Sequence, residues 1–491
     1  MNLEEENNTL LNHLLLENKR ELIAKILVFA LIIVSLFTLT TSPIVWYDEV
    51  CMASESLSFF ETGKLNLTAN PYFFTGEVLH YGPVYFLATA LSFKFFGFGI
   101  FQYRLVAWIS ALIIIYLLAF RKSILTRETI FLFVLLLMSD MTFLKSSHSG
   151  RMETLAIVFS VATYLIIFQS KSYSILKFAL IGLFSALAVL VTPRSGFLLV
   201  PVFIQLIILL FNKKLSVAYI LSMAMSSAIP VLLWFGHAYD FSLDAFINEI
   251  KEIQSVGSGF AGTHFRISAV QAHLVLATLV ILAIDAVKNK FGFVKKYWYF
   301  FSGIVLFYLL VKDFGPYSVY IIWIFYVLIM LWVGTNKKRL YLPIILLFIN
   351  FGFMSLKYFT VLSTYEYRNM SFATVEIAKS IPEGSLVVGD MRYFYSVHLN
   401  GSTFRYNEED YSIEKFEKLQ RENDDYDYLI LSSQRNRDYP NILRTYEKNS
   451  ELELVGTIAL GEPKGEIIEL ILSKFTLKYN YSGSIYKRKK D

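Results

Sequence analysis

The sequence has little charge and almost no cysteine. Only 17% of its 491 residues are charged, and Cys51 is its single cysteine. An ordinary soluble domain carries about 25% charged residues. One cysteine excludes an internal disulfide and a cysteine-based zinc site, and the His-x-x-x-His and His-Glu-x-x-His spacings are also absent. The basic residues, with a net charge of +5, form scattered clusters and no stripe, which argues against nucleic-acid binding.

The sequence is instead rich in long hydrophobic runs. Hydrophobic residues make up 55% and aromatics 16% of the chain. A run of about 20 apolar residues crosses a bilayer as a helix. Runs near this length, some needing flanking residues, recur at 26–41, 103–120, 129–144, 155–168, 178–192, 196–211, 215–235, 267–284, 297–311, 317–333 and 340–356. They predict an α-helical polytopic membrane protein with about 11–13 spans.

The basic clusters predict the orientation of these spans. If the N-terminus is cytoplasmic, one crossing per run places the clusters at 121–127, 171–177, 213–214, 288–296 and 337–339 inside, as the positive-inside rule requires. This count requires Tyr81–Phe96 to be a surface or re-entrant helix. We therefore expect a multi-pass protein of the plasma (inner) membrane with a cytoplasmic leader (1–25), a membrane domain (26–357) and outer loops at 42–102 and 236–266. The acidic leader argues against a signal peptide, and residues 3–22 are either a surface helix or solvated chain.

The last part of the chain, residues 358–491, has more charge and shorter apolar runs. Strands are predicted at 385–388, 428–431, 451–459 and 467–472, and amphipathic helices at 373–379 and 413–421. This alternation predicts a soluble extracytoplasmic α/β domain.

Polar residues gather at the predicted outer ends of the spans. Asp48 and Glu49 follow Trp46 and Tyr47 at the membrane boundary, where partial burial would raise a carboxylate pKa and suit it to act as a base. His80 and Tyr81 precede Gly82-Pro83. This segment either marks only the start of a helix, or it places His80 and Tyr81 as hydrogen-bond donors that face the same cavity as Asp48.

Three further segments carry candidate binding residues. Arg151 and Glu153 form either a local ion pair or a site for a phosphate and a sugar hydroxyl. Arg194 lies in a short hairpin, where a guanidinium suits an anionic headgroup or extends to the lipid surface. The loop 236–266 predicts a mobile lid with His264 and Arg266 as candidate ligands. A divalent cation bound by Asp48 and by an acid distant in the sequence is an alternative that the sequence leaves open.

The order of these elements resembles the glycosyltransferase-C superfold, in its branch of protein O-mannosyltransferases and aminoarabinose (lipid A) transferases. The resemblance covers essentially the whole membrane part. It rests on the following order of motifs: Asp48-Glu49, His80-Tyr81-Gly82-Pro83, Phe95-Phe96-Gly97, Arg104-Leu105, Arg151-Met152-Glu153 and Thr192-Pro193-Arg194-Ser195-Gly196. Tyr81-Gly82 replaces the first Pro of a His-Pro-Pro element, Glu153 replaces Asp, and Arg194 replaces Lys.

The resemblance implies an inverting glycosyltransferase that moves a sugar from a polyprenyl-phosphate donor to a lipid, glycan or protein acceptor at the outer face. Asp48 would be the base, with Glu49 beside it. His80 and Glu153 would position sugar or acceptor, and Arg151 and Arg194 would hold phosphate. The main alternative is a lipid or glycolipid transporter that uses the same acids, and a scaffold without catalysis is a third possibility. Transporters place such charges near mid-membrane, so the outer position of these residues favours the enzyme.

Overall fold

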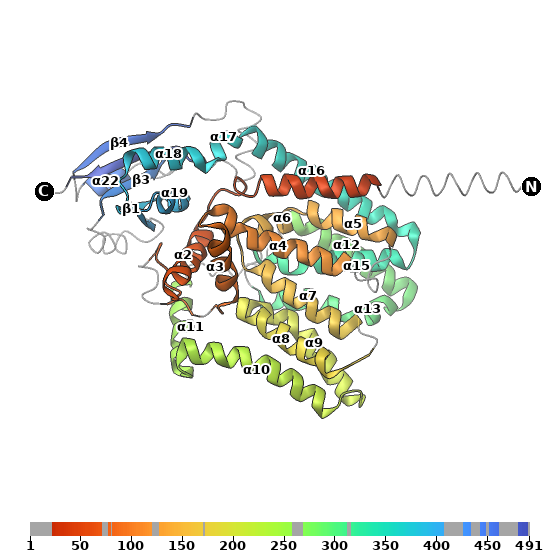
Figure 1. Cartoon of the computed structure of the whole chain (residues 1–491). Coiled ribbons are helices and arrows are strands. Elements are labelled where there is room, and N and C mark those ends of the chain that lie inside the picture. Colours follow the sequence, from red (N-terminus) through yellow and green to blue (C-terminus); the bar gives the residue numbers. More distant parts are fainter. Residues whose placement is uncertain are drawn as a thin grey trace, which may run out of the picture.

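The fold is a bundle of apolar helices with a small sheet-containing domain at one end (Figure 1). The computed structural model describes residues 22–70, 77–79, 81–119, 127–169, 172–257, 269–311, 316–406, 426–433, 442–447, 451–460 and 480–489. The predicted fold class, a polytopic helical membrane protein with a C-terminal α/β domain, is confirmed.

Within these described ranges, five stretches are long and apolar enough to cross a membrane. They are α4 (Ile100–Ala119), Pro193–Phe211 with α9 (Gly196–Phe211), α10 (Val217–Tyr239), Gln271–Asn289 within α12 (Ala269–Asn289), and Lys338–Ser363 with α16 (Tyr341–Ser363). A sixth span is formed if α5 (Arg127–Ser139) and α6 (Met141–His148), bent by 64°, cross together. Shorter apolar helices are Leu22–Phe37, α3 (Val84–Phe96), α7 (Glu153–Gln169), α8 (Ile175–Val191), α14 (Trp298–Leu310) and α15 (Val319–Gly334).

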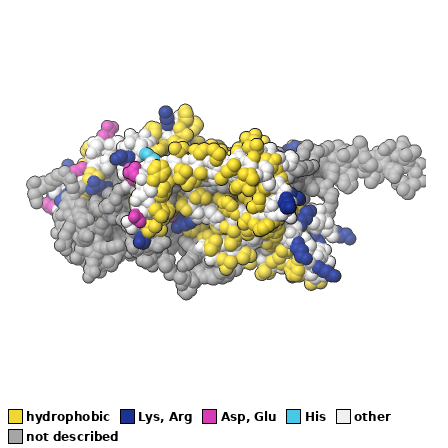
Figure 2. Space-filling model, turned by 90° about the horizontal axis from the view of Figure 1, so that it is seen from below, with side chains coloured by type: hydrophobic (Ala, Val, Ile, Leu, Met, Phe, Trp, Pro, Cys, Tyr) yellow, Lys and Arg dark blue, Asp and Glu magenta, His cyan; other side chains and the backbone are white. Residues whose placement is uncertain are grey.

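The outer surface of the bundle has the pattern of a membrane protein. Figure 2 shows hydrophobic side chains across the middle of one face, with Lys and Arg gathered toward the end away from the sheet domain. Large apolar residues of α10, such as Leu233 and Met225, are exposed. Inside the bundle, by contrast, every residue of α15 from Val319 to Val333 is buried. A helix that is apolar all round belongs at the centre of such a bundle.

Two helices near the sheet domain do not run with the bundle. α2 (Tyr47–Thr62) and α3 pack on each other, and the Thr89 hydroxyl donates a 2.7 Å hydrogen bond to the Ser56 hydroxyl. With 13 residues, α3 is about 20 Å long, shorter than a hydrocarbon core of about 30 Å. Just before α3, a Cβ on Gly82 would lie 2.1 Å from the Leu190 carbonyl oxygen of α8, so this close approach requires glycine.

The described residues of the C-terminal domain form a five-stranded mixed sheet in the order β2-β1-β3-β5-β4. The strands are β1 (Leu386–Gly389), β2 (Thr403–Tyr406), β3 (Tyr428–Ser432), β4 (Leu452–Ile458) and β5 (Gly483–Arg488). The predicted strands at 385–388, 428–431 and 451–459 are confirmed, as is the helix at 373–379, which is α18 (Met370–Ser380). β2 and β5 were not predicted. The strand at 467–472 and the helix at 413–421 lie outside the described residues.

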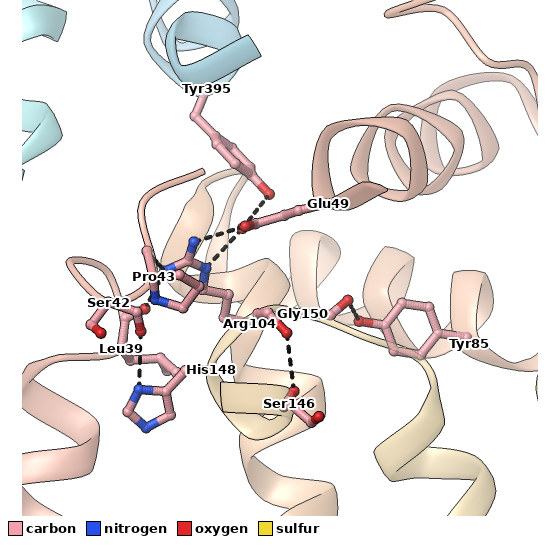
Figure 3. A network of polar contacts seen from close by, with 11 residues as sticks. Leu39, Ser42, Pro43, Glu49, Tyr85, Arg104, Ser146, His148, Gly150 and Tyr395 are labelled. Atoms are coloured by element: carbon pink, nitrogen blue, oxygen red, sulfur yellow. Dashed lines mark hydrogen bonds and ion pairs between the residues drawn. The ribbon is translucent and has the colours of Figure 1, made fainter. Parts of the chain in front are cut away.

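The end of the membrane part leads directly into the C-terminal domain. α16 continues to Ser363, past the predicted domain boundary at 357, and α17 (Tyr365–Arg368) follows directly. α19 (Phe394–Leu399) of the C-terminal domain faces the start of α2 through Tyr395 (Figure 3). The loop 236–266 contains a helix, α11 (Leu243–Gly257).

Candidate active site

Arg151 is the centre of a polar cluster at one end of the bundle. It lies between α6 and α7, and its Nε and Nη2 donate to the two carboxylate oxygens of Glu153, at 2.9 and 2.5 Å. Its Nη1 donates to Asp48 Oδ2 at 2.9 Å. The sequence places Asp48 in the first turn of α2 and Glu153 at the start of α7, so two helix starts bring their acids to one guanidinium.

Aromatic rings bring a second arginine to the same cluster. The Arg151 guanidinium lies over the rings of Trp46 and Tyr317, 5.2 and 5.1 Å from their centroids. Arg194 lies 4.2 Å from the centroid of the same Tyr317 ring and donates a hydrogen bond to the Tyr317 hydroxyl. Each ring face attracts a cation, so Tyr317 holds two arginines that would otherwise repel each other.

The members of the cluster differ in exposure. The side chains of Arg151 and Glu153 are 3% exposed, whereas that of Asp48 is 39% exposed. Arg194 is also exposed. Asp48 and Arg194 are therefore the two members that a bound molecule can reach. Burial around Asp48 raises the pKa of its carboxyl, and the ion pair with Arg151 acts in the opposite direction.

Two more residues surround this cluster. Tyr81 lies within electrostatic range of Arg194, Tyr317 and Glu153. Lys145, on α6, is exposed and lies within range of Arg151 and Asp48. Tyr81 was predicted from the sequence as a site residue, whereas Lys145 was not. Lys145 could have been chosen as a candidate, because the predicted orientation places it in the same outer loop as Arg151.

Glu49 points to a different partner from Asp48. Its two carboxylate oxygens accept from Nε and Nη2 of Arg104 at 2.8 and 2.7 Å, and both side chains are fully buried (Figure 3). The Tyr395 hydroxyl of the C-terminal domain donates to Glu49 Oε1 at 3.4 Å. The structure thus places Glu49 between the membrane domain and the C-terminal domain, without access for a substrate.

Arg104 also fixes the chain that leads into α2. Its Nη1 donates to the carbonyl oxygens of Leu39 and Pro43 at 2.7 and 2.8 Å. His148, the last residue of α6, contacts the same segment, with its Nδ1 3.1 Å from the Ser42 carbonyl oxygen (Figure 3). This anchoring holds the first residues of α2, and so Asp48, in place.

The predicted site residues divide into three groups. Asp48, Tyr81, Arg151, Glu153 and Arg194 come together, whereas Glu49 lies in the separate pair with Arg104. His80, His264 and Arg266 lie outside the described residues. Among the residues that the structure describes, no group of three His, Cys, Asp or Glu side chains could hold a metal ion.

Comparisons with known proteins agree with the fold. No protein-family model matches the chain, and no curated protein matches it by sequence. The crystal structure of ArnT from Cupriavidus metallidurans bound to undecaprenyl phosphate is similar over 94% of this chain and 97% of that one, with a TM-score of 0.59 and 12% identity. The apo state of the same protein gives a TM-score of 0.55 and 11% identity over the same shares. ArnT has the glycosyltransferase-C fold. This chain therefore has the glycosyltransferase-C fold.

Proposed function

We propose that this protein is a membrane glycosyltransferase that moves a sugar from a polyprenyl-phosphate donor to an acceptor at the outer face of the membrane. One observation carries the proposal: a reachable carboxylate, Asp48, and a reachable guanidinium, Arg194, belong to the cluster around Arg151. A base for an acceptor hydroxyl and cations for a departing phosphate are the two things that this reaction needs from the protein.

The reaction is a single displacement. The acceptor hydroxyl oxygen attacks the anomeric carbon while the bond from that carbon to the phosphate oxygen breaks. Asp48 takes the hydroxyl proton, and the polyprenyl phosphate leaves with the bonding electrons. Attack opposite to the leaving group inverts the anomeric configuration.

The surrounding residues receive separate roles in this proposal. Arg194, which is exposed, contacts the donor phosphate, and Tyr317 orients it. Glu153 positions Arg151, since both of its oxygens are already occupied by that guanidinium. Glu49 is a positioning residue that acts through Arg104 on the start of α2.

The likeness to ArnT supports the choice of donor. That structure contains undecaprenyl phosphate, a polyprenyl phosphate. Such a carrier suits a site at the outer end of membrane helices, because its lipid chain stays in the bilayer while its phosphate lies at the surface.

The test is transfer by the purified full chain in lipid vesicles, supplied with a panel of labelled polyprenyl-phosphate sugars and with acceptor membranes. We expect label on an acceptor and an inverted anomeric configuration in the product. Movement of an unchanged labelled lipid between leaflets, without transfer from any donor, would overturn the proposal in favour of the transporter.

A further inference from the structure

A second group of cations lies where the last membrane helix meets the C-terminal domain. Lys357, near the end of α16, is 7% exposed, and Arg368, at the end of α17, is 2% exposed. The backbone N–H of Tyr481 donates to the Tyr367 carbonyl oxygen at 3.3 Å, which fixes the C-terminal domain against α17. Both cations are therefore enclosed at this junction.

The guanidinium of Arg368 has unused donors. Its Nε and Nη1 are buried without a hydrogen-bond partner among the described residues, and the same holds for the hydroxyl of Tyr481. These two side chains lie within electrostatic range of each other. A buried donor without a partner costs about 1–3 kcal/mol, more when it is charged, so such groups are uncommon unless something binds them.

The charges of this cluster do not balance. Lys357 lies within range of three other cations, Arg368, Lys145 and Arg104. In the described part of the chain, the neighbouring acid Glu49 is already occupied by Arg104. Burial lowers the pKa of Arg368 to about 10, which still leaves it protonated at neutral pH. Because Lys145 is exposed and Arg104 is paired, the imbalance comes from Lys357 and Arg368, two buried cations within electrostatic range of each other, an arrangement that an anion would stabilise.

From these unpaired donors and this excess charge, we propose that Arg368, Lys357 and Tyr481 bind a phosphate-bearing anion. A guanidinium offers parallel N–H groups that match two phosphate oxygens, and an ammonium adds a point charge. The phosphate comes either from an anionic lipid headgroup at the outer membrane surface or from free phosphate. These three residues are not members of the cluster around Arg151, and the proposed binding does not rest on the transfer reaction.

The first test measures phosphate binding in a background that lacks the exposed cation of the candidate active site. The Tm of the full-length Arg194→Gln protein is followed as inorganic phosphate replaces chloride at constant ionic strength. We expect a saturable rise in Tm. Adding Arg368→Met should remove this rise or increase the half-saturating phosphate concentration at least about tenfold, and Lys357→Met should act in the same direction. Lys379→Gln, which removes an exposed lysine of the same domain, is the matched control and should leave the response unchanged.

A second measurement separates the two sources and guards against misfolding. The same proteins are placed in nanodiscs of phosphatidylcholine with and without phosphatidylglycerol. A Tm rise that needs Arg368 and phosphatidylglycerol identifies a headgroup, and one that needs only inorganic phosphate identifies the free ion. In buffer without either, Arg368→Met should keep or raise the Tm, because it removes an unpaired buried charge. A lower Tm for Arg368→Met, with an undiminished response to both anions, would overturn the proposal and leave Arg368 a structural residue.

Discussion

Asp48 and Glu49 are adjacent in the chain, yet their carboxylates bind different arginines and differ in exposure. Asp48 pairs with Arg151 and is 39% exposed, whereas Glu49 pairs with Arg104 and is fully buried. Successive residues of a helix point about 100° apart, so two neighbouring acids at the start of α2 reach different surroundings. One faces the candidate active site, and the other joins α2 to the bundle.

The first prediction concerns the stability of these two positions. Glu49→Gln leaves the Arg104 guanidinium buried without a counter-charge and should destabilise the fold by about 3–5 kcal/mol. Asp48→Asn should change stability by less than about 1 kcal/mol, because this pair is partly solvated. Thermal unfolding of both variants in the same detergent compares them. An equal loss of stability for the two variants would contradict a structural role for Glu49 alone. The double variant Glu49→Leu with Arg104→Met should recover part of the stability that Glu49→Gln loses.

The second prediction concerns recognition of the donor phosphate. Arg194→Gln should raise KM for the polyprenyl-phosphate sugar about tenfold to hundredfold, because it removes a charge-assisted contact. Tyr317→Phe keeps the ring beside both arginines and should have a smaller effect than Tyr317→Ala. Steady-state kinetics at varied donor concentration give these values. Arg194 would have no role in phosphate binding if the Gln variant kept the donor KM of the wild type.

The third prediction concerns the acid limb of the pH profile. Asp48 acts as a base only when ionised, so activity is present above its pKa and is lost as the pH falls through it. Burial raises this pKa, so the limb should lie above the ordinary value of 3.8. Arg194 lowers the pKa of Asp48, and Arg194→Gln should therefore shift the limb to higher pH. A limb that stays in place would argue that another group is titrating.

Only part of this site could be predicted from the sequence. Hydropathy and the basic clusters placed Asp48, Arg151 and Arg194 on one side of the membrane, and the structure brings them together. The partner of Glu49 could not be predicted, because Arg104 lies in a span and hydropathy does not say which side chain it meets. Hydropathy also did not indicate that Arg368 is buried, since a single arginine after a predicted span is expected at the surface.

The strands of the C-terminal domain could likewise be predicted only in part. β1 and β3 are short buried apolar runs and were predicted. β5 ends in Lys487 and Arg488, whose charge hides the strand pattern, although the strand pairs with both β3 and β4. Whether such a segment forms a strand depends on pairing with strands on both sides, and this pairing depends on the tertiary fold.

The fourth prediction concerns Glu55, a buried acid on α2. Burial, and then the nearby Glu249 carboxylate of α11, hold the pKa of Glu55 well above its usual value of 4.5. The folded protein then binds this proton more tightly than the unfolded chain. The resulting stability is present below pH 4.5 and is lost as the pH rises through the folded pKa.

Glu55→Gln should accordingly be more stable than the wild type at neutral pH and should lack this loss of stability. Tm measured across pH for both proteins is the check, with the exposed Glu451→Gln as a matched control that should follow the wild type. A Glu55→Gln protein that is less stable at neutral pH would show that the charged form is favoured in the fold.

The most direct test of the proposed chemistry is sugar transfer by Asp48→Asn. Wild type and variant are compared at equal amounts of folded protein in the same vesicles, with the polyprenyl-phosphate sugar and acceptor that the wild type uses. We predict that kcat falls at least about hundredfold, because the base is lost, while the donor KM changes little. Transfer at the wild-type rate by Asp48→Asn would contradict the proposed mechanism, since no other carboxylate of this cluster is both reachable and adjacent to Arg151 in the described part of the chain.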